Sequence, residues 1–246
     1  MIILNFGIPR SGTVWTYNVF RSLWRREQIS YHAFSPNSPL EVDECLDQLN
    51  PRENYLIHGH SITPALVEFA QRPDVRPFFN YRDPRDVVVS QIRLHDISLA
   101  TAMEFTQQAY RSLQTGMCLP GIMLIPYGHI VDHPEAVIFQ AATKLGIMLR
   151  LSECRTIGEE NSMGRLKKVM EAVNDTKGHD TESLGVDVGV AETNTRDIRY
   201  DRRHLITDRH IQSGKTGRWR EELSEDDQDL VNRAFGPLIQ VLGFDA

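Results

Sequence analysis

Short apolar runs alternate with amphipathic segments over the first 147 residues of the chain. Buried strands are predicted where the runs are nearly continuous, at residues 2–6, 54–60, 75–81 and 121–127. Between the runs, apolar side chains recur every three or four residues, as on one face of a helix. The helices so predicted cover residues 13–26, 40–49, 63–71, 83–94, 99–115 and 133–147. Because strands and helices alternate, we expect an α/β fold with a central parallel β-sheet flanked by helices, in a single domain over residues 1–246.

The pattern changes after residue 150. A helix is predicted near residues 160–173, and a C-terminal helix begins after Ser224, whose side chain suits an N-cap followed by acidic residues. Between these helices, residues 175–207 contain few large apolar side chains and show no sustained period. Such a stretch cannot bury enough apolar surface to order itself strongly, so we expect a functional or mobile loop there.

Composition narrows the classes of protein that fit. Charged residues make up 24% of the chain and the net charge is −6, which argues against a general nucleic-acid binder. No segment is long enough for a membrane-spanning helix, and the N-terminal apolar run is too short for a signal peptide. The three cysteines match neither a disulfide framework nor a metal-site spacing. We therefore expect a cytoplasmic protein without a metal ion, a membrane partner or a nucleic-acid partner.

The stretch GIPRSGTVW, residues 7–15, follows the first predicted strand. Gly7 and Gly12 have the spacing of a phosphate-binding P-loop, but the Lys and the Ser or Thr that normally follow are absent. Arg10 lies inside the loop and supplies a permanent positive charge. Backbone N–H groups, the helix N-terminus and the hydroxyls of Ser11 and Thr13 could hold an anion, without the usual Mg²⁺ ligands. A glycine turn that binds nothing is the alternative.

Two further groups of polar residues follow predicted strands. Arg82 ends the third strand, where ligands bind in open α/β sheets, and Ser90 lies two turns into the next helix. His58 and His60 are two residues apart in the second strand and so point to the same face. Histidine is suited to act as a general base near neutral pH. A structural histidine and a zinc site remain alternatives, although no further ligands have a recognisable zinc-site spacing.

The loop at residues 9–15, P-R-S-G-T-V-W, resembles the 5′-phosphosulfate loop of the cytosolic-type sulfotransferases, usually P-K-S-G-T-T-W. The resemblance implies sulfuryl transfer from 3′-phosphoadenosine-5′-phosphosulfate (PAPS) to a small-molecule acceptor, with 3′,5′-ADP as product and without a metal. By this resemblance the loop binds the 5′ end of the donor, and Arg10 stabilises the leaving 5′-phosphate. The loop residues so assigned are Arg10, Ser11, Gly12, Thr13, Val14 and Trp15, the last of which stacks on adenine unless it belongs to the core.

Three other segments extend the resemblance over nearly the whole chain. The R-x-x-x-D-x-x-x-S pattern at Arg82, Asp86 and Ser90 implies a grip on the 3′-phosphate, and Tyr127 is expected near the adenine. The segment RHIQSGKTGRWREEL resembles the family's nucleotide-closing segment R-K-G-x-x-G-D-W, so residues 212–215 are expected to bind the nucleotide. These four are Gln212, Ser213, Gly214 and Lys215; the first two replace Arg and Lys of the family, and Arg218 replaces Asp.

The resemblance also assigns the base and a lid. His60 aligns with the catalytic histidine of the family's K-T-H segment and His58 with its lysine. Residues 175–207 correspond to a region that helps to cover the acceptor and nucleotide sites. Two alternatives stay open: a P-loop phosphotransferase, which should show the absent G-K-[ST] sequence, and a catalytically silent nucleotide-binding protein. The identity of the acceptor and the question of a homo-oligomer are left open by the sequence.

Overall fold

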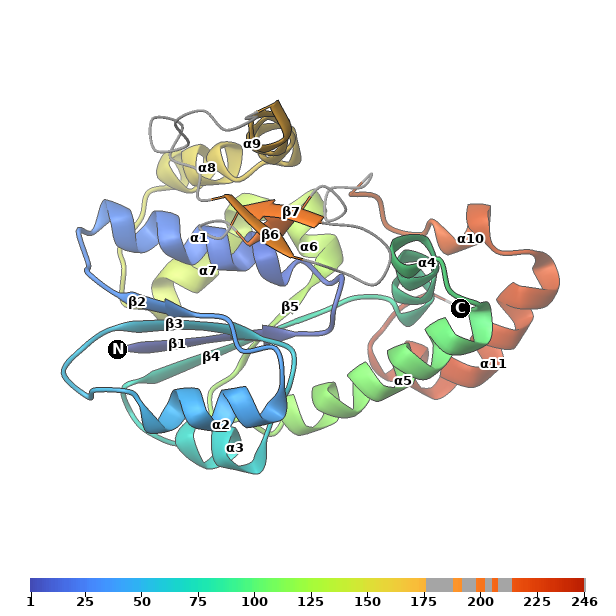
Figure 1. Cartoon of the computed structure of the whole chain (residues 1–246), viewed down its shortest axis with the longest axis horizontal. Helices are drawn as coiled ribbons and strands as arrows, with labels where there is room; N and C mark the ends of the chain where they lie inside the picture. The colour runs from blue at the N-terminus through green and yellow to red at the C-terminus, as the bar shows by residue number, and fades with distance from the viewer. Residues whose placement is uncertain (176–187, 192–197, 202–204, 208–213, 246) are drawn as a thin grey trace.

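The computed structural model describes residues 1–175, 188–191, 198–201, 205–207 and 214–245. At its centre lies a parallel sheet of five strands in the order β2-β3-β1-β4-β5 (Figure 1). The strands are β1 Ile2–Gly7, β2 His32–Phe34, β3 Tyr55–Gly59, β4 Val75–Tyr81 and β5 Met123–Pro126. Strand β1 occupies the middle, so its residues are buried on both faces of the sheet. The predicted α/β fold is therefore confirmed.

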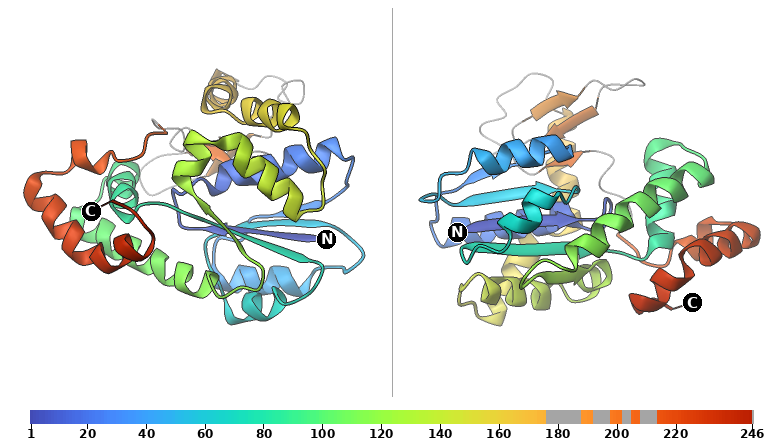
Figure 2. Two further views of the ribbon diagram at one scale, coloured as in Figure 1. Left: turned by 180° about the vertical axis from the view of Figure 1, so that it is seen from behind. Right: turned by 90° about the horizontal axis from the view of Figure 1, so that it is seen from below.

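Helices cover both faces of the sheet (Figures 1 and 2). One face packs against α1 Thr13–Arg26, α6 Tyr127–Asp132, α7 Pro134–Lys144 and α8 Leu151–Glu160. The other packs against α2 Pro39–Asp47, α3 Pro64–Phe69 and α5 Leu99–Gly116. Alternate residues of β1 enter the two cores: Ile3 joins the first, and Leu4 and Phe6 join the second. This alternation is the ordinary consequence of strand geometry and holds the carboxyl end of β1 rigidly.

A third, smaller apolar core lies beside the carboxyl ends of the strands. Here α4 Pro84–His95 packs between α5 and α11 Glu225–Val241, through Val88, Ala102 and Phe235 among others. Helix α10 Trp219–Glu222 contacts α4 as well. The segment that resembles the nucleotide-closing segment is thus held next to α4 by packing outside the central sheet.

Most elements were predicted within a few residues, but several short ones were missed. Strand β2 lies between two predicted helices, in a stretch where no strand was expected, and helices α6 and α8 were not expected. Within residues 175–207, the strands β6 Val188–Ala191, β7 Ile198–Asp201 and β8 Ile206–Thr207 form an antiparallel sheet. The expectation of no regular structure is wrong for these strands, because backbone pairing orders a hairpin without a large apolar face. The rest of the predicted lid lies outside the described residues.

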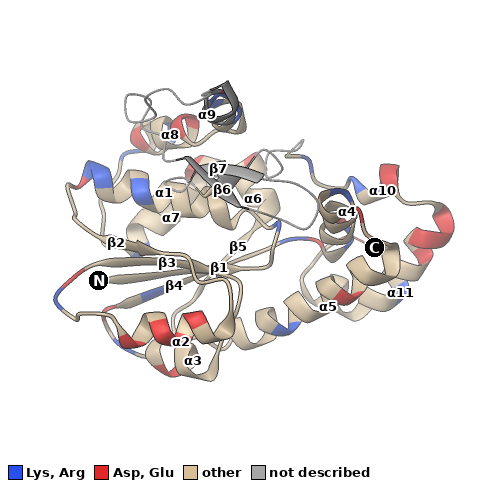
Figure 3. Cartoon of the chain, viewed as in Figure 1, with Lys and Arg blue, Asp and Glu red and all other residues tan. Residues whose placement is uncertain are grey.

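Helix α9 Met163–Asp175 confirms the helix predicted near residues 160–173. No helix in the described ranges is long and apolar enough to cross a membrane. Acidic side chains gather on α2 and α3 and at the start of α11, whereas basic ones lie near the end of α1 and around α4 (Figure 3). The charges of the described residues are thus mixed over the molecule, in keeping with the small net charge.

Candidate active site

The loop from Gly7 to Gly12 joins the carboxyl end of β1 to the N-terminus of α1. Gly12 adopts φ of 90° as the residue before the helix, and Arg10 adopts φ of 70°. A Cβ on Gly12 would lie 2.7 Å from Cδ1 of Ile130, so a larger residue would have to displace the end of that side chain and would be strained by the positive φ as well. The tight turn directs the backbone of the loop and the start of α1 toward the same side, as an anion site requires.

Buried polar side chains fix this loop through hydrogen bonds to its backbone and to one another. Asn5 donates from Nδ2 to the Thr13 carbonyl at 2.9 Å, and Thr16 lies 2.8 Å from Asn5 Oδ1 and 3.0 Å from Asn80 Oδ1. Ser11 Oγ lies 2.5 Å from the Ile8 carbonyl and 3.0 Å from the Asn80 carbonyl. Because buried polar groups need partners, this network fixes the loop in one conformation. The Ser11 hydroxyl is thereby turned inward, unlike the sequence-based expectation that it would face an anion.

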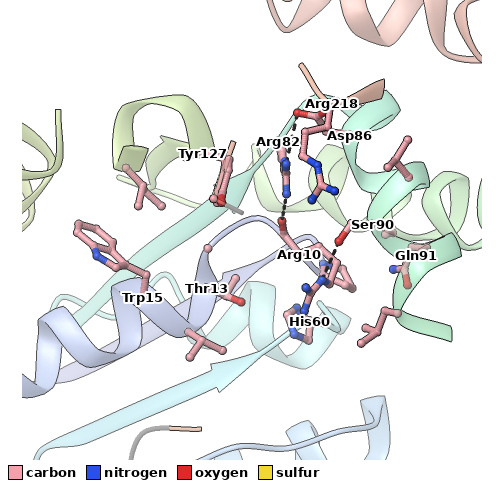
Figure 4. A pocket seen from close by; sticks show the side chains of 18 of the residues that line it. Arg10, Thr13, Trp15, His60, Arg82, Asp86, Ser90, Gln91, Tyr127 and Arg218 are labelled. Atoms are coloured by element: carbon pink, nitrogen blue, oxygen red, sulfur yellow. Dashed lines mark hydrogen bonds and ion pairs between the residues drawn. The ribbon is translucent and has the colours of Figure 1, made fainter. Parts of the chain in front are cut away.

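Beside the loop lies a cavity of about 870 Å³. Its wall comes from segments that are far apart in sequence. The lining residues include most of the predicted site: Arg10, Gly12, Thr13, Val14, Trp15, His60, Arg82, Ser90, Tyr127, Gly214 and Lys215. Figure 4 shows Arg10, His60, Arg82 and Ser90 gathered around the loop. The structure therefore brings together in one cavity most of the residues that the family resemblance assigned to a single site; Ser11 is the exception among those that the structure describes.

Arg10 projects from the loop toward α4. Its Nε donates to the Ser90 hydroxyl at 2.9 Å (Figure 4). Burial, aided by the nearby charge of Arg82, lowers the pKa of Arg10 to about 10. At that value the guanidinium is still charged at neutral pH. A permanent cation thus faces the cavity from inside the loop, whereas the P-loop of a nucleotide triphosphatase carries its lysine directly after the second glycine, where Thr13 stands here.

Arg82 links three parts of the cavity wall. It donates from Nη1 to the Arg10 carbonyl at 3.2 Å and from Nη2 to the Lys215 carbonyl at 2.9 Å. Its guanidinium lies 4.2 Å from the centre of the Tyr127 ring. The Nε of Arg82 is buried and has no hydrogen-bond partner among the described residues. A buried guanidinium with a donor to spare is suited to bind an additional anion at this point.

Asp86 joins the segment at residues 214–219 to α4. Its buried carboxylate accepts the N–H groups of Gly217 at 2.9 Å and Trp219 at 3.3 Å, and lies 3.4 Å from Arg82 Nη2. The Trp219 ring is covered by the Arg85 guanidinium at 4.0 Å. Together these contacts place Gly214 and Lys215 at the cavity wall.

His60 follows β3 and reaches the loop. The register pairs Phe6 with Gly59, so His60 lies next to Gly7, and its Nδ1 is 2.7 Å from the Gly7 carbonyl. Since a carbonyl only accepts, Nδ1 carries the proton and the lone pair of the neutral ring is on Nε2. The ring is open to the cavity, yet the surrounding wall desolvates it. This desolvation lowers the pKa of His60; the charge of Arg10 acts in the same direction, and the Gly7 hydrogen bond opposes it.

By its structure the chain is similar to known sulfotransferases. A mouse sulfotransferase complexed with PAP matches 97% of this chain and 84% of its own at a TM-score of 0.66 and 16% identity. A retinol dehydratase matches in two complexes, one with androsterone and inactive cofactor PAP and one with retinol and PAP. Each covers 97% of this chain and 80% or 81% of its own, at a TM-score of 0.61 and 14% identity. The chain has the cytosolic-type sulfotransferase fold. No family model and no curated protein sequence matches it.

Within this sulfotransferase fold, the other predicted residues are placed as follows. Trp15 lines the cavity and is also 91% buried in the first core; its stacking on adenine stays a prediction. His58 is buried under α1, where its Nδ1 lies 3.2 Å from Asn5 Nδ2. Gln212 and Ser213 lie outside the described residues. Among the described residues no group of three or more His, Cys, Asp or Glu side chains could hold a metal ion.

One part of the cavity wall was not predicted from the sequence. It comes from α4 and α5, whose lining side chains include Gln91, Leu94, His95, Phe105, Gln108, Ala109 and Ser112. On α5 these residues recur at helical spacing, which was interpreted only as the apolar pattern of a helix. The sequence signal that could have revealed this wall is a second face of α5, on which glutamine and serine lie among small and apolar side chains.

Proposed function

We propose that this protein transfers a sulfuryl group from PAPS to a hydroxyl or amine of a small-molecule acceptor. The observation that carries the proposal is that Arg10, His60, and the pair Arg82 and Ser90 come from three separate segments and line one cavity. The likeness of the whole fold to sulfotransferases complexed with PAP supports the same conclusion. The cytoplasmic location inferred from the sequence stays a prediction.

The proposed donor site uses both ends of the nucleotide. The loop N–H groups and Arg10 bind the 5′-phosphosulfate, and Arg82 and Ser90 bind the 3′-phosphate. Arg82 donates to the carbonyls of Arg10 and Lys215 in the structure. A 3′-phosphate would accept a hydrogen bond from Nε of Arg82, which has no partner in the described part of the chain, and would replace one or both of the carbonyls as an acceptor. Charge-assisted hydrogen bonds of this kind are among the strongest that proteins form. Tyr127 and Trp15 lie at the wall where the base would stack.

The proton, the two S–O bonds and the leaving-group charge of the proposed sulfuryl transfer are all accounted for without a metal ion. Nε2 of His60 accepts the proton of the acceptor hydroxyl as the new S–O bond forms. The S–O bond to the donor phosphate breaks, and its electron pair remains on the 5′-phosphate oxygen. Arg10 then stabilises the negative charge that develops on this leaving group. Because arginine stays protonated, Arg10 acts as a fixed cation and not as a proton donor.

Two measurements test the proposal. In a thermal-shift experiment, 3′,5′-ADP should raise the melting temperature more than ATP with Mg²⁺ does, since a ligand that binds only the native state stabilises it. The opposite order would favour a phosphotransferase. Incubation with sulfur-labelled PAPS and a mixture of phenols and alcohols should then give labelled products. Binding of 3′,5′-ADP without any product would favour the catalytically silent alternative.

A further inference from the structure

The cavity extends to either side of the reacting groups. Figure 4 shows Trp15 on one side of Arg10 and His60, and Gln91 on the other. On the Trp15 side the wall holds Tyr127, which suits the base of the donor. The 3′-phosphate site proposed at Ser90 reaches the start of the wall on the Gln91 side. Because an in-line transfer places the incoming oxygen opposite the leaving phosphate, we assign the acceptor to the part of this side that lies beyond Ser90. The acceptor wall, as we define it, consists of the lining residues of α4 and α5 from Gln91 to Ser112.

The acceptor wall carries polar side chains of an uncharged kind. Gln91, Gln108 and Ser112 line it together with the apolar Leu94 and Phe105. Of the ionisable lining residues on these two helices, Asp86 binds the N–H groups of Gly217 and Trp219, and only His95 lies within the acceptor wall. A charged acceptor would thus find no lysine, arginine or carboxylate in this wall; Lys215 and Arg218 line another part of the cavity, where Arg218 is paired with Glu222. The chemistry favours an uncharged molecule with an apolar body.

Gln91 places a buried polar group in this wall, among its apolar side chains. The residue is 94% buried, and its Oε1 has no hydrogen-bond partner among the described residues. A buried amide oxygen without a partner is costly, and natural proteins rarely retain one without a function. Since a glutamine amide can turn about its last bond, it can offer either a donor or an acceptor to a ligand. A hydroxyl group satisfies both orientations, because it donates and accepts.

Resting on the proposed function, we infer that Gln91 and Gln108 select an uncharged acceptor with a second hydroxyl group. The first hydroxyl faces His60 and receives the sulfuryl group. The apolar body of the acceptor packs against Leu94 and Phe105. The second hydroxyl, distant from the first, bonds to the glutamine amides of α4 and α5. These glutamines are specificity-determining residues and do not take part in the transfer itself.

Four para-substituted phenols test this inference, since they share the reacting group and ring size. They are p-ethylphenol, tyrosol, tyramine and p-hydroxyphenylacetate, which end in a methyl, a hydroxyl, an ammonium and a carboxylate. The full chain should show a kcat/KM for tyrosol about tenfold above that of each of the others. Gln91→Leu and Gln108→Leu should each reduce the tyrosol preference over p-ethylphenol about threefold to tenfold, the worth of one or two neutral hydrogen bonds.

Gln107→Leu is the matched control, because Gln107 neighbours Gln108 on α5 but is not a lining residue. It should leave the preference unchanged. Calorimetric binding of each phenol to the complex with 3′,5′-ADP gives a second readout that needs no turnover. Equal kcat/KM and equal binding for tyrosol and p-ethylphenol, or no binding of either, would overturn the inference. Failure to bind 3′,5′-ADP would instead contradict the proposed function.

Discussion

The carboxylate of Asp86 accepts the backbone N–H of Gly217 at 2.9 Å, across 131 positions of the chain. The same carboxylate contacts Arg82, which donates to the Lys215 carbonyl in the same segment. Asp86 thus holds this segment by its N–H groups and Arg82 holds it by a carbonyl group. A ligand that binds Arg82 therefore acts on the same backbone segment that Asp86 holds at this side of the cavity. Asp86 is accordingly a positioning residue.

We expect Asp86→Asn to lower the free energy of unfolding by about 2–4 kcal/mol, because an amide cannot replace a buried carboxylate that accepts several bonds. Urea unfolding measures this loss. Hydrogen exchange should accelerate at Gly217 and Trp219. Asp96→Asn is the control: Asp96 is exposed and left-handed, a conformation that asparagine tolerates, so stability should change by less than about 0.5 kcal/mol. Unaltered exchange at both amides would contradict the positioning role.

Arg82→Ala should weaken binding of 3′,5′-ADP much more than binding of 5′-AMP, because only the former carries a 3′-phosphate. The extra loss for 3′,5′-ADP should be about 1.5–3 kcal/mol, the worth of charge-assisted contacts. Calorimetry with both nucleotides measures it. Arg111→Ala, on the exposed part of α5, should weaken neither. Equal losses for the two nucleotides would remove Arg82 from a 3′-phosphate site.

His60→Ala should reduce kcat for sulfuryl transfer roughly 10²–10⁴-fold, the usual contribution of a general base, and leave 3′,5′-ADP affinity nearly unchanged. Desolvation by the cavity wall lowers the pKa of His60, so its neutral form persists to lower pH than that of an ordinary histidine. The acid limb of kcat/KM should therefore lie below pH 6.5, the ordinary value, and vanish in the variant. A limb that persists in His60→Ala would assign the base elsewhere. His58→Ala should reduce kcat less, because His58 lies beneath α1 and not at the cavity.

Arg10→Gln should reduce kcat about 10²–10³-fold, since it removes the charge that opposes the leaving phosphate. Arg10→Lys restores the charge and should recover most of that rate at neutral pH. Single-turnover kinetics with labelled PAPS separate this effect from product release. If Arg10→Gln and Arg10→Lys lost the same rate, the contribution of Arg10 would be geometric and not electrostatic.

Gly12→Ala should lower the free energy of unfolding by about 1–3 kcal/mol, because its φ of 90° and the 2.7 Å approach to Ile130 both oppose a side chain. Gly128→Ala is a control from the adjacent helix α6, where an added Cβ meets nothing within 4 Å. Since alanine is the better helix former, that variant should be neutral or slightly stabilised. Urea unfolding of both proteins measures the difference, and equal stabilities would contradict the described loop.

The sequence predicted strands and helices correctly where the apolar pattern was continuous or was repeated over several turns. The continuous apolar run of β1 and the repeating pattern of α5 each exclude other local structures. The period failed for β2, whose three residues gain their order from pairing with β3, and for the short hairpin strands after residue 187. Pairing partners lie outside the local sequence, so no local pattern could show them.

The site residues divide in the same way. Residue type and position in the chain pointed to Arg10, to Arg82 and to the pair His58 and His60, because charge and acid–base chemistry belong to the side chain; the resemblance to the sulfotransferases then implied Ser90 and His60. Their meeting in one cavity was decided by the order of the strands, which places β3 and β4 on either side of β1. The inward turn of Ser11 and the acceptor wall of α4 and α5 were likewise decided by tertiary structure. The sequence by itself determined which groups are present; only packing decided which of them face the same space, since burial and direction depend on neighbours distant in the chain.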